Sequence, residues 1–98
     1  MVEVLVMFPK PEEPSALEAF VAAFVPDLES APGCRSVRVS TGDVMSRGGP
    51  PPYVRIVEAT FDSLGDWMGW VMAPARAQHQ QKFDRFRPVV VFFEATAT

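Results

Sequence analysis

Tyr53-Val54-Arg55-Ile56-Val57-Glu58-Ala59-Thr60-Phe61 is the longest alternating stretch of the chain, and it predicts a central strand of a small sheet. Two charged residues, Arg55 and Glu58, stand in this otherwise apolar stretch. They are three positions apart, and successive side chains of a strand point to opposite faces, so one charge should face each side of the sheet. A charge that is buried alone is costly, so each should pair with a neighbouring strand. The candidate partners are Glu3, Arg38 and Glu94.

Three further segments predict strands on either side of this stretch, over residues 2–8, 34–41 and 89–94. β-branched and aromatic residues dominate the first and the last of them, and the middle one alternates. In the middle segment, alternation would place Arg35, Val37 and Val39 on one side. Residues 42–52 carry too many glycines and prolines to be anything but a loop, and 95–98 is expected to be a loose tail.

A first helix is predicted between the strands over 2–8 and 34–41. Ser15 and Glu18 have the spacing of a capping box, which would open this helix. Pro26 is expected to bend or restart the helix near its end, because proline removes one hydrogen bond and crowds the preceding turn. The apolar residues recur at offsets of three and four, at Leu17, Phe20, Val21, Phe24 and Leu28.

A second helix is predicted after the central strand. Ser63, with Asp66 three positions later, provides its start signal. Pro74 is expected to divide this helix, leaving a second half over 75–86 that Pro88 ends. Leu64, Trp67, Met68 and Val71 form the apolar side of its first half.

The order of elements is β-α-β, loop, β-α-β, which predicts an α+β fold of the ferredoxin-like type. Its four-stranded antiparallel sheet would carry two helices on one face. The first and last strands are apolar on both faces, unlike a sheet with one face in water, so the second face should also be covered. A homodimer is the simplest cover, with two sheets stacked into an eight-stranded α/β barrel.

Composition excludes several classes of function. The net charge is −3 and Lys and Arg are spread along the chain, so no nucleic-acid partner is expected. The apolar runs are too short to span a bilayer and no basic leader is present, which predicts a cytoplasmic protein without a membrane partner. One cysteine and one histidine cannot build a disulfide or a Cys/His zinc site. No phosphate loop, nucleophile elbow or dinucleotide fingerprint is present, so no cofactor or metal is expected.

Several short motifs resemble those of EthD-type proteins in the dimeric α/β-barrel superfamily. In the first half these are Lys10-Pro11-Glu12-Glu13-Pro14, Phe20, Phe24-Val25-Pro26-Asp27-Leu28 and Pro32-Gly33. In the second half they are Phe61, Trp67, Ala73-Pro74 and residues 84–86. The resemblance covers nearly the whole chain, and it implies a single EthD-like α+β domain over 1–98.

The chain departs from this family at one informative position. EthD-type sequences often carry a His-Val-Pro segment in the first helix, whereas this chain has Phe24-Val25-Pro26. An acid–base role of that histidine cannot be carried over. The apolar periodicity places Phe24 on the inward face of the helix, so this wall of the expected pocket should be aromatic, and the pocket either more apolar or filled.

His79, the only imidazole, lies four residues before Phe83 and seven before Phe86, at the apolar edge of the second helical segment. It is interpreted as a residue of the core edge, with general acid or base and haem or metal ligand as alternatives. A hydrophobic small molecule is expected to bind between the helices and the sheet. Its candidate contacts are Phe20, Phe24, Tyr53, Arg55, Trp67 and Trp70.

Three functions follow from these residues. The leading one is a homodimeric EthD-like protein that binds a small hydrophobic molecule, with the isomerase, cyclase or oxygenase-type activity that the resemblance implies. The alternatives are a ligand-binding or accessory protein without catalysis and a haem-binding relative. Core packing alone would also explain the aromatic residues. For Arg55 and Glu58, structural ion pairs or contacts across a dimer interface are the alternatives to a role in a site.

Overall fold

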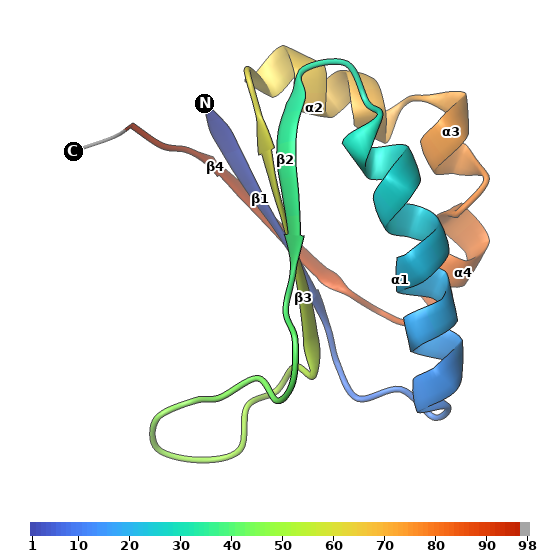
Figure 1. Ribbon diagram of the computed structural model, residues 1–98, viewed down its shortest axis with the longest axis vertical. Helices are drawn as coiled ribbons and strands as arrows, with labels where there is room; N and C mark the ends of the chain where they lie inside the picture. The colour runs from blue at the N-terminus through green and yellow to red at the C-terminus, as the bar shows by residue number, and fades with distance from the viewer. Residues whose placement is uncertain (97–98) are drawn as a thin grey trace.

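The computed structural model describes residues 1–96 and shows a four-stranded antiparallel sheet with its helices on one side (Figure 1). The strands lie in the order β2-β3-β1-β4. Their bounds are Val2–Phe8 for β1, Cys34–Val39 for β2, Arg55–Phe61 for β3 and Val89–Glu94 for β4. The helices are α1, Pro14–Glu29; α2, Leu64–Val71; α3, Pro74–Ala77; and α4, Gln80–Arg85. The predicted α+β, ferredoxin-like arrangement is confirmed.

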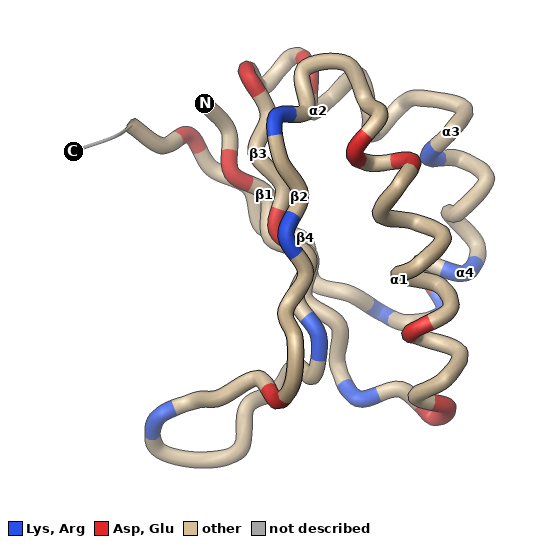
Figure 2. Tube along the Cα trace, in the orientation of Figure 1, with Lys and Arg blue, Asp and Glu red and all other residues tan. Residues whose placement is uncertain are grey.

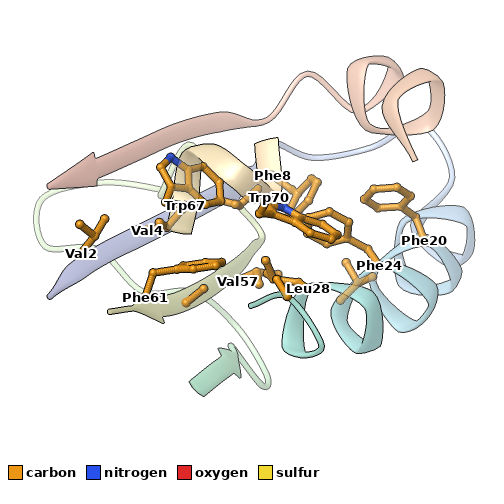
Figure 3. Close-up of a cluster of buried hydrophobic side chains, with 14 of the residues drawn as sticks. Val2, Val4, Phe8, Phe20, Phe24, Leu28, Val57, Phe61, Trp67 and Trp70 are labelled. Atoms are coloured by element: carbon orange, nitrogen blue, oxygen red, sulfur yellow. The ribbon is translucent and has the colours of Figure 1, made fainter. Parts of the chain in front are cut away.

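The core lies between the sheet and the helices (Figure 3). Alternate residues of β1 point into it, since the burial of this strand switches at every position. α1 contributes the predicted apolar stripe, with Leu17, Phe20, Val21, Phe24 and Leu28 all buried. α2 contributes Trp67 and Trp70, which are also buried. Trp70 was expected only at the margin of the helix stripe, and its burial corrects this.

α1 begins differently from the sequence prediction. The helix starts at Pro14, after Glu13, and no side chain caps its first turn. The predicted capping box of Ser15 and Glu18 is therefore wrong. Proline suits a first helical position because it has no N–H that would need a partner there, and the cap is Glu13 instead of Ser15, so the helix starts two residues earlier than predicted. Pro26 does not restart the helix either, because it lies in the last turn and costs only one hydrogen bond.

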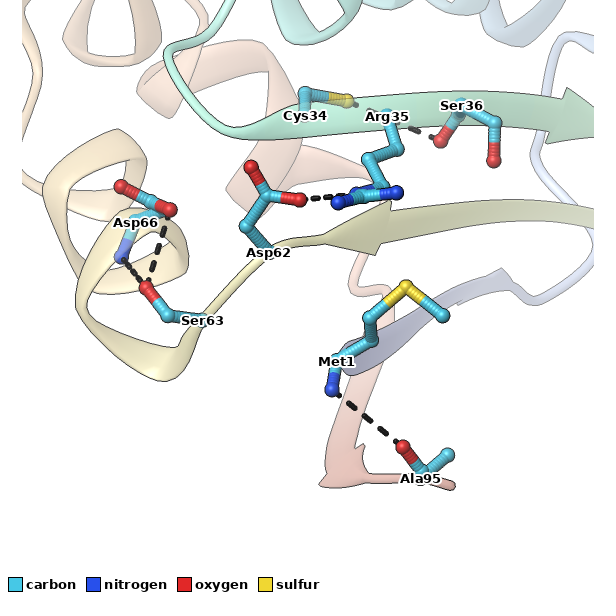
Figure 4. Close-up of polar contacts among 8 residues, drawn as sticks. All are labelled: Met1, Cys34, Arg35, Ser36, Asp62, Ser63, Asp66 and Ala95. Carbon is cyan, nitrogen blue, oxygen red and sulfur yellow. Dashed lines mark hydrogen bonds and ion pairs between the residues drawn. The ribbon is translucent and has the colours of Figure 1, made fainter. Parts of the chain in front are cut away.

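The second helical segment starts as predicted. The Ser63 hydroxyl oxygen accepts a hydrogen bond from the Asp66 backbone N–H at 3.1 Å (Figure 4). Pro74 begins a separate helix, so the predicted division is also confirmed. The residues after it were expected to form one helical half over 75–86. They form two short helices instead, α3 and α4, and His79 lies at the break between them.

Two strand boundaries differ from the predictions. β3 begins at Arg55 and not at Tyr53, although the Val54 N–H still donates to the Phe8 carbonyl at 2.8 Å. β2 ends at Val39, and its register shifts between Cys34 and Ser36. Such a bulge adds one residue to the strand, so the expected alternation is broken. Cys34, rather than Arg35, therefore packs beside Val37 and Val39 against the core.

Arg35 is left exposed at this bulge and forms an ion pair with Asp62 at the end of β3 (Figure 4). The hydrogen bond and charge of Asp62 raise the pKa of Arg35. The long connection between β2 and β3 extends away from the helices (Figure 1). The predicted tail begins as a continuation of the sheet, since the Ala95 N–H donates to the Met1 carbonyl at 2.9 Å. Ala97 and Thr98 lie outside the described residues.

Arg55 and Glu58 point to opposite faces of the sheet, as their spacing predicts. Arg55 is on the helix side and binds Glu18 of α1 through Nε at 3.0 Å. Glu58 is on the other side and pairs with Arg38, one of the predicted partners. The partner of Arg55 comes from a helix and not from a neighbouring strand, because the helix side of the sheet is covered by α1.

The face of the sheet away from the helices is called the open face below. Every second residue of β1, β3 and β4 points to this face, and these residues lie opposite one another in the paired strands. The apolar ones are Leu5, Met7, Ile56, Val89, Val91 and Phe93. Its polar residues pair with each other, Arg38 with Glu58 and Thr60 with Glu3 at 2.9 Å. Much of this face is thus apolar and uncharged.

Figure 2 shows acidic and basic residues interspersed along the chain, without a continuous stripe of either sign. Within residues 1–96, none of the helices combines the length and the apolar character that crossing a membrane requires.

Candidate ligand-binding site

A cavity of about 230 Å³ opens between the helices and β4, and we call it the apolar pocket. Four helices and one strand contribute to its wall. The lining residues are Phe24 of α1; Trp67, Met68, Trp70 and Val71 of α2; Arg76 of α3; Phe83 of α4; and Val90 and Phe92 of β4. Figure 3 shows Phe24, Trp67 and Trp70 in the layer between the helices and the strands.

Aromatic contacts hold the walls of the apolar pocket in place. The Phe24 ring lies 6.2 Å from Trp70 at an interplanar angle of 62°, and 5.8 Å from Phe83. Trp67 lies 5.9 Å from Phe92, whose side chain remains 46 % exposed. Edge and tilted ring contacts of this kind stabilise by about 0.5–1.5 kcal/mol each beyond the burial of area. The walls are therefore firm, and Phe92 marks the open side.

Trp67 carries a polar atom without a partner. Its indole nitrogen Nε1 is buried and makes no hydrogen bond with the described part of the chain. A buried donor left unsatisfied costs about 1–3 kcal/mol, so such atoms need an explanation. The nitrogen is not accessible from the apolar pocket, so Trp67 contributes the carbon atoms of its ring to the wall.

The second cavity is an open groove of about 1180 Å³ outside the core, and we call it the outer groove. It lies between the segment 9–13, the outer side of α1 and the region from Gln78 to Arg87. Phe20 and His79 both line it. The groove is more polar than the apolar pocket, since Lys, Arg, Glu and Asp side chains border it.

His79 forms a dyad with Asp27 of α1. The distance from His79 Nε2 to Asp27 Oδ2 is 2.6 Å, and the Gln78 amide donates to the same oxygen at 2.9 Å. The imidazole ring packs edge-on against Phe20 and Phe24, with centroids 6.0 and 5.6 Å away. His79 thus sits at the core edge, as its spacing predicts. A carboxylate on one ring nitrogen orients the imidazole, an arrangement that acid–base sites use.

Sequence reasoning missed Asp27 as a partner of His79. A signal was present, because Asp27 follows Phe20 by seven positions and Phe24 by three, which places it on the same side of α1.

Among residues 1–96, no three His, Cys, Asp or Glu side chains gather as a metal site would need.

The six predicted ligand contacts separate in the structure. Phe24, Trp67 and Trp70 line the apolar pocket, and Phe20 lines the outer groove. Tyr53 lies before β3 and lines neither cavity. Arg55 lines neither as well, because Glu18 and the Ser40 carbonyl, 2.6 Å from Nη1, hold its guanidinium group.

The other pocket residues were missed because they come from separate parts of the chain. Arg76, Phe83 and Phe92 belong to three different elements that meet only in the folded protein. The spacing of Phe83 predicts an apolar position but does not indicate which cavity it lines.

Cys34 lines neither cavity. Its thiol is half-buried beside the core, and this burial raises its pKa.

Comparison of whole structures reveals similar folds. An ethyl tert-butyl ether D (EthD) family protein from Bacillus halodurans has a TM-score of 0.78 and 15 % identity, over 98 % of this chain and 99 % of that one. A dimeric ferredoxin-like protein of unknown function from Jannaschia has a TM-score of 0.75 and 16 % identity, over 96 % and 98 % of the two chains. The chain has a ferredoxin-like fold. Its predicted likeness to EthD-type proteins is confirmed at the level of structure.

A third protein with this ferredoxin-like fold is SnoaB, a cofactor-independent oxygenase from Streptomyces nogalater. Its TM-score is 0.77 and its identity 14 %, over 99 % of this chain and 94 % of SnoaB. No family model matches the chain, and no curated protein matches it in sequence. Since all three identities are low, the likeness concerns the fold alone.

Proposed function

We propose that the protein binds a small hydrophobic molecule in the apolar pocket. The observation that carries this is the cavity itself, an apolar space walled by aromatic rings from α1, α2, α4 and β4. Ligand sites are mostly apolar concavities with a few polar groups, usually of about 300–1,000 Å³ for drug-sized molecules. At about 230 Å³ this pocket suits a smaller molecule, of one or two rings.

A neutral fluorescent probe tests this proposal. Prodan, a neutral naphthalene with two fused rings, should bind and brighten, and it should also quench Trp67 and Trp70, the only two tryptophans, because both line the pocket. Val71→Phe fills the cavity, so the probe loses the space that it needs. Binding should weaken about tenfold or more, which corresponds to a loss of about 1.4 kcal/mol or more in binding free energy. Ala22→Phe, on the exposed side of α1, is the matched control and should bind normally. Equal binding by both variants would contradict the proposal.

The working form that we propose is a homodimer with the two open faces stacked. An apolar sheet face without helices is unusual on a monomer, because large exposed apolar patches generally mark interfaces. The ion pair of Arg38 with Glu58 leaves this face without an isolated buried charge. The similar protein from Jannaschia is described as dimeric, which supports a dimer here, whatever its arrangement. Two four-stranded sheets would then form the predicted eight-stranded barrel.

An enzymatic role is the second candidate, and the dyad of Asp27 and His79 is the observation that favours it. Asp27 orients the imidazole, which could then take or give a proton on a bound molecule. His79 borders the outer groove, while its neighbour Phe24 borders the apolar pocket. The proposed reaction class is proton transfer in an isomerase, cyclase or cofactor-independent oxygenase. SnoaB shows that the fold accommodates the last of these.

The haem alternative has weaker support. His79 would be the axial ligand, but Asp27 already engages its Nε2 at 2.6 Å. Iron would have to displace that contact or use the other ring nitrogen, so we do not propose haem binding. Haem titration followed by an absorbance spectrum would overturn this choice if a Soret band formed and vanished in His79→Ala.

A further inference from the structure

The side chains that line the apolar pocket carry polar groups that are nearly all hydrogen-bond donors. These are the indole N–H of Trp67, which is itself inaccessible, the indole N–H of Trp70 and the guanidinium group of Arg76. Met68 adds only a thioether, which accepts weakly. No carboxylate, amide or hydroxyl side chain lines the pocket. A ligand that complements this wall must therefore bring acceptor atoms.

Arg76 is the only charged residue of this wall, and its charge is not balanced. Two arginines of the described chain are half-buried, Arg55 and Arg76. Arg55 is paired with Glu18, whereas Arg76 forms no ion pair with any residue in 1–96. A half-buried charge without a counter-ion is costly, so the unpaired guanidinium indicates that the counter-ion comes from outside the chain.

The position of Arg76 is well defined although its charge is unpaired. Its Nη1 binds the side-chain oxygen of Gln80, whose amide in turn donates to Asp84 at 2.7 Å. Its guanidinium carbon lies 5.6 Å from the centroid of the Phe83 ring. These contacts hold the planar group against the pocket wall and leave its other N–H groups without a partner in the described residues. A guanidinium group held this way can bind a carboxylate through two parallel hydrogen bonds.

Trp67 of α2 and Arg76 of α3 come from different helices and line the same small cavity. The Trp67 indole nitrogen is inaccessible, so Arg76 carries the donor groups that an anion in this cavity would meet. In such surroundings the low dielectric strengthens a contact between donors and an anion.

We propose that the ligand is a small apolar carboxylate and that Arg76 is the residue that selects its charge. This rests on the proposed binding function and names the ligand class. The apolar part would lie against Phe24, Trp70 and Phe83, and the carboxylate would face Arg76. A larger polyanion does not fit, because the wall offers one cation in a space of about 230 Å³.

A pair of isosteric compounds tests the proposal with the full chain. para-Butylbenzoate and para-butylbenzamide have the same shape and differ in charge, and quenching of the two tryptophans reports their binding. The benzoate should bind about tenfold or more tightly than the amide, as charged hydrogen bonds contribute. Arg76→Gln should weaken the benzoate about tenfold or more and leave the amide within about twofold. Arg76→Lys should retain part of the preference, since it keeps the charge but loses the planar fork.

Arg85→Gln is the matched control, because Arg85 is an exposed arginine of α4 that borders the outer groove and not the pocket. It should leave both affinities unchanged. Thermal unfolding of each variant shows whether the fold is intact. If both compounds bind wild-type protein equally, or if Arg76→Gln weakens both alike, the role of Arg76 is wrong and the binding function stands. If neither compound binds, the binding function and the role of Arg76 both fail.

Discussion

Asp27 and His79 show how one contact between distant residues can matter for both stability and function. They are 52 positions apart, and their 2.6 Å contact ties α1 to the break between α3 and α4. The His79 side chain is 12 % exposed, so water replaces Asp27 only partly if the carboxylate is removed. The same break also positions the start of α4, since the Phe83 N–H donates to the His79 carbonyl at 2.8 Å.

Asp27→Ala should therefore destabilise the protein by about 1–3 kcal/mol, because it leaves His79 and Gln78 without their shared acceptor. Urea unfolding followed by tryptophan fluorescence measures this. Glu29→Ala, at an exposed acidic residue of the same helix, is the control and should change stability by less than about 0.5 kcal/mol.

If the dyad is also catalytic, His79→Gln should abolish turnover of a substrate while probe binding in the apolar pocket persists. A His79→Gln variant with full turnover would remove the enzymatic candidate.

At the scale of the elements, two serines with similar sequence signals behave differently. Ser15 precedes Glu18 by three positions, and Ser63 precedes Asp66 by three. Only Ser63 caps a helix, because its backbone is extended and its hydroxyl reaches the Asp66 N–H. Ser15 lies inside α1, since Pro14 already occupies the first helical position.

Ser63→Ala should therefore cost about 1 kcal/mol, the usual contribution of a serine N-cap. Ser15→Ala should be neutral or slightly stabilising, since alanine is the better helix former and no cap is lost. Both variants are compared by urea denaturation at one pH. A larger loss for Ser15→Ala than for Ser63→Ala would contradict the observed helix starts.

At the scale of the whole molecule, the two faces of the sheet differ in how far they are buried within the single chain. The helix side buries a continuous core, with Val57, Ala59 and Phe61 of β3 nearly inaccessible. The open face carries apolar residues that the chain itself does not cover, including Val91 and Phe93, which are 42 % and 47 % exposed. A partner sheet would bury them, and stable interfaces typically bury about 1,600 Å² in total.

Val91→Lys should make the protein monomeric in sedimentation velocity at micromolar concentration, because a lysine buried without a partner costs several kcal/mol. Its circular dichroism should be unchanged, since Val91 is exposed in the single chain. Met72→Lys is the matched control, an 82 % exposed apolar residue on the helix side that should leave the dimer intact. A wild-type protein that sediments as a monomer would contradict the proposed homodimer.

Local patterns alone were sufficient for the order of elements, the opposite faces of Arg55 and Glu58, and the apolar side of α1. These depend on periods of two and of 3.6 residues, which are read along short stretches. The serine cap at Ser63 and the break at Pro74 could also be read locally. The start of α1 had a local signal as well, Pro14 at the first helical position, which competed with the spacing of Ser15 and Glu18. The bulge at Arg35 and the break at His79 had no such signal, because they depend on contacts with distant segments.

The pocket depended on the tertiary structure. Phe24, Arg76 and Phe92 come from a helix near the start, a short helix late in the chain and the last strand. No spacing along the sequence relates them, because their distances are set by how α1 and β4 pack across the core. The prediction that Tyr53 and Arg55 contact the ligand was limited in the same way. The sequence did not show that α1 would bring Glu18 to Arg55 and form an ion pair with it. Local patterns in the sequence were enough for the sheet, its two faces and the apolar side of α1. Only long-range packing decided which side chains surround the apolar pocket and which charge, that of Arg76, was left there without a partner.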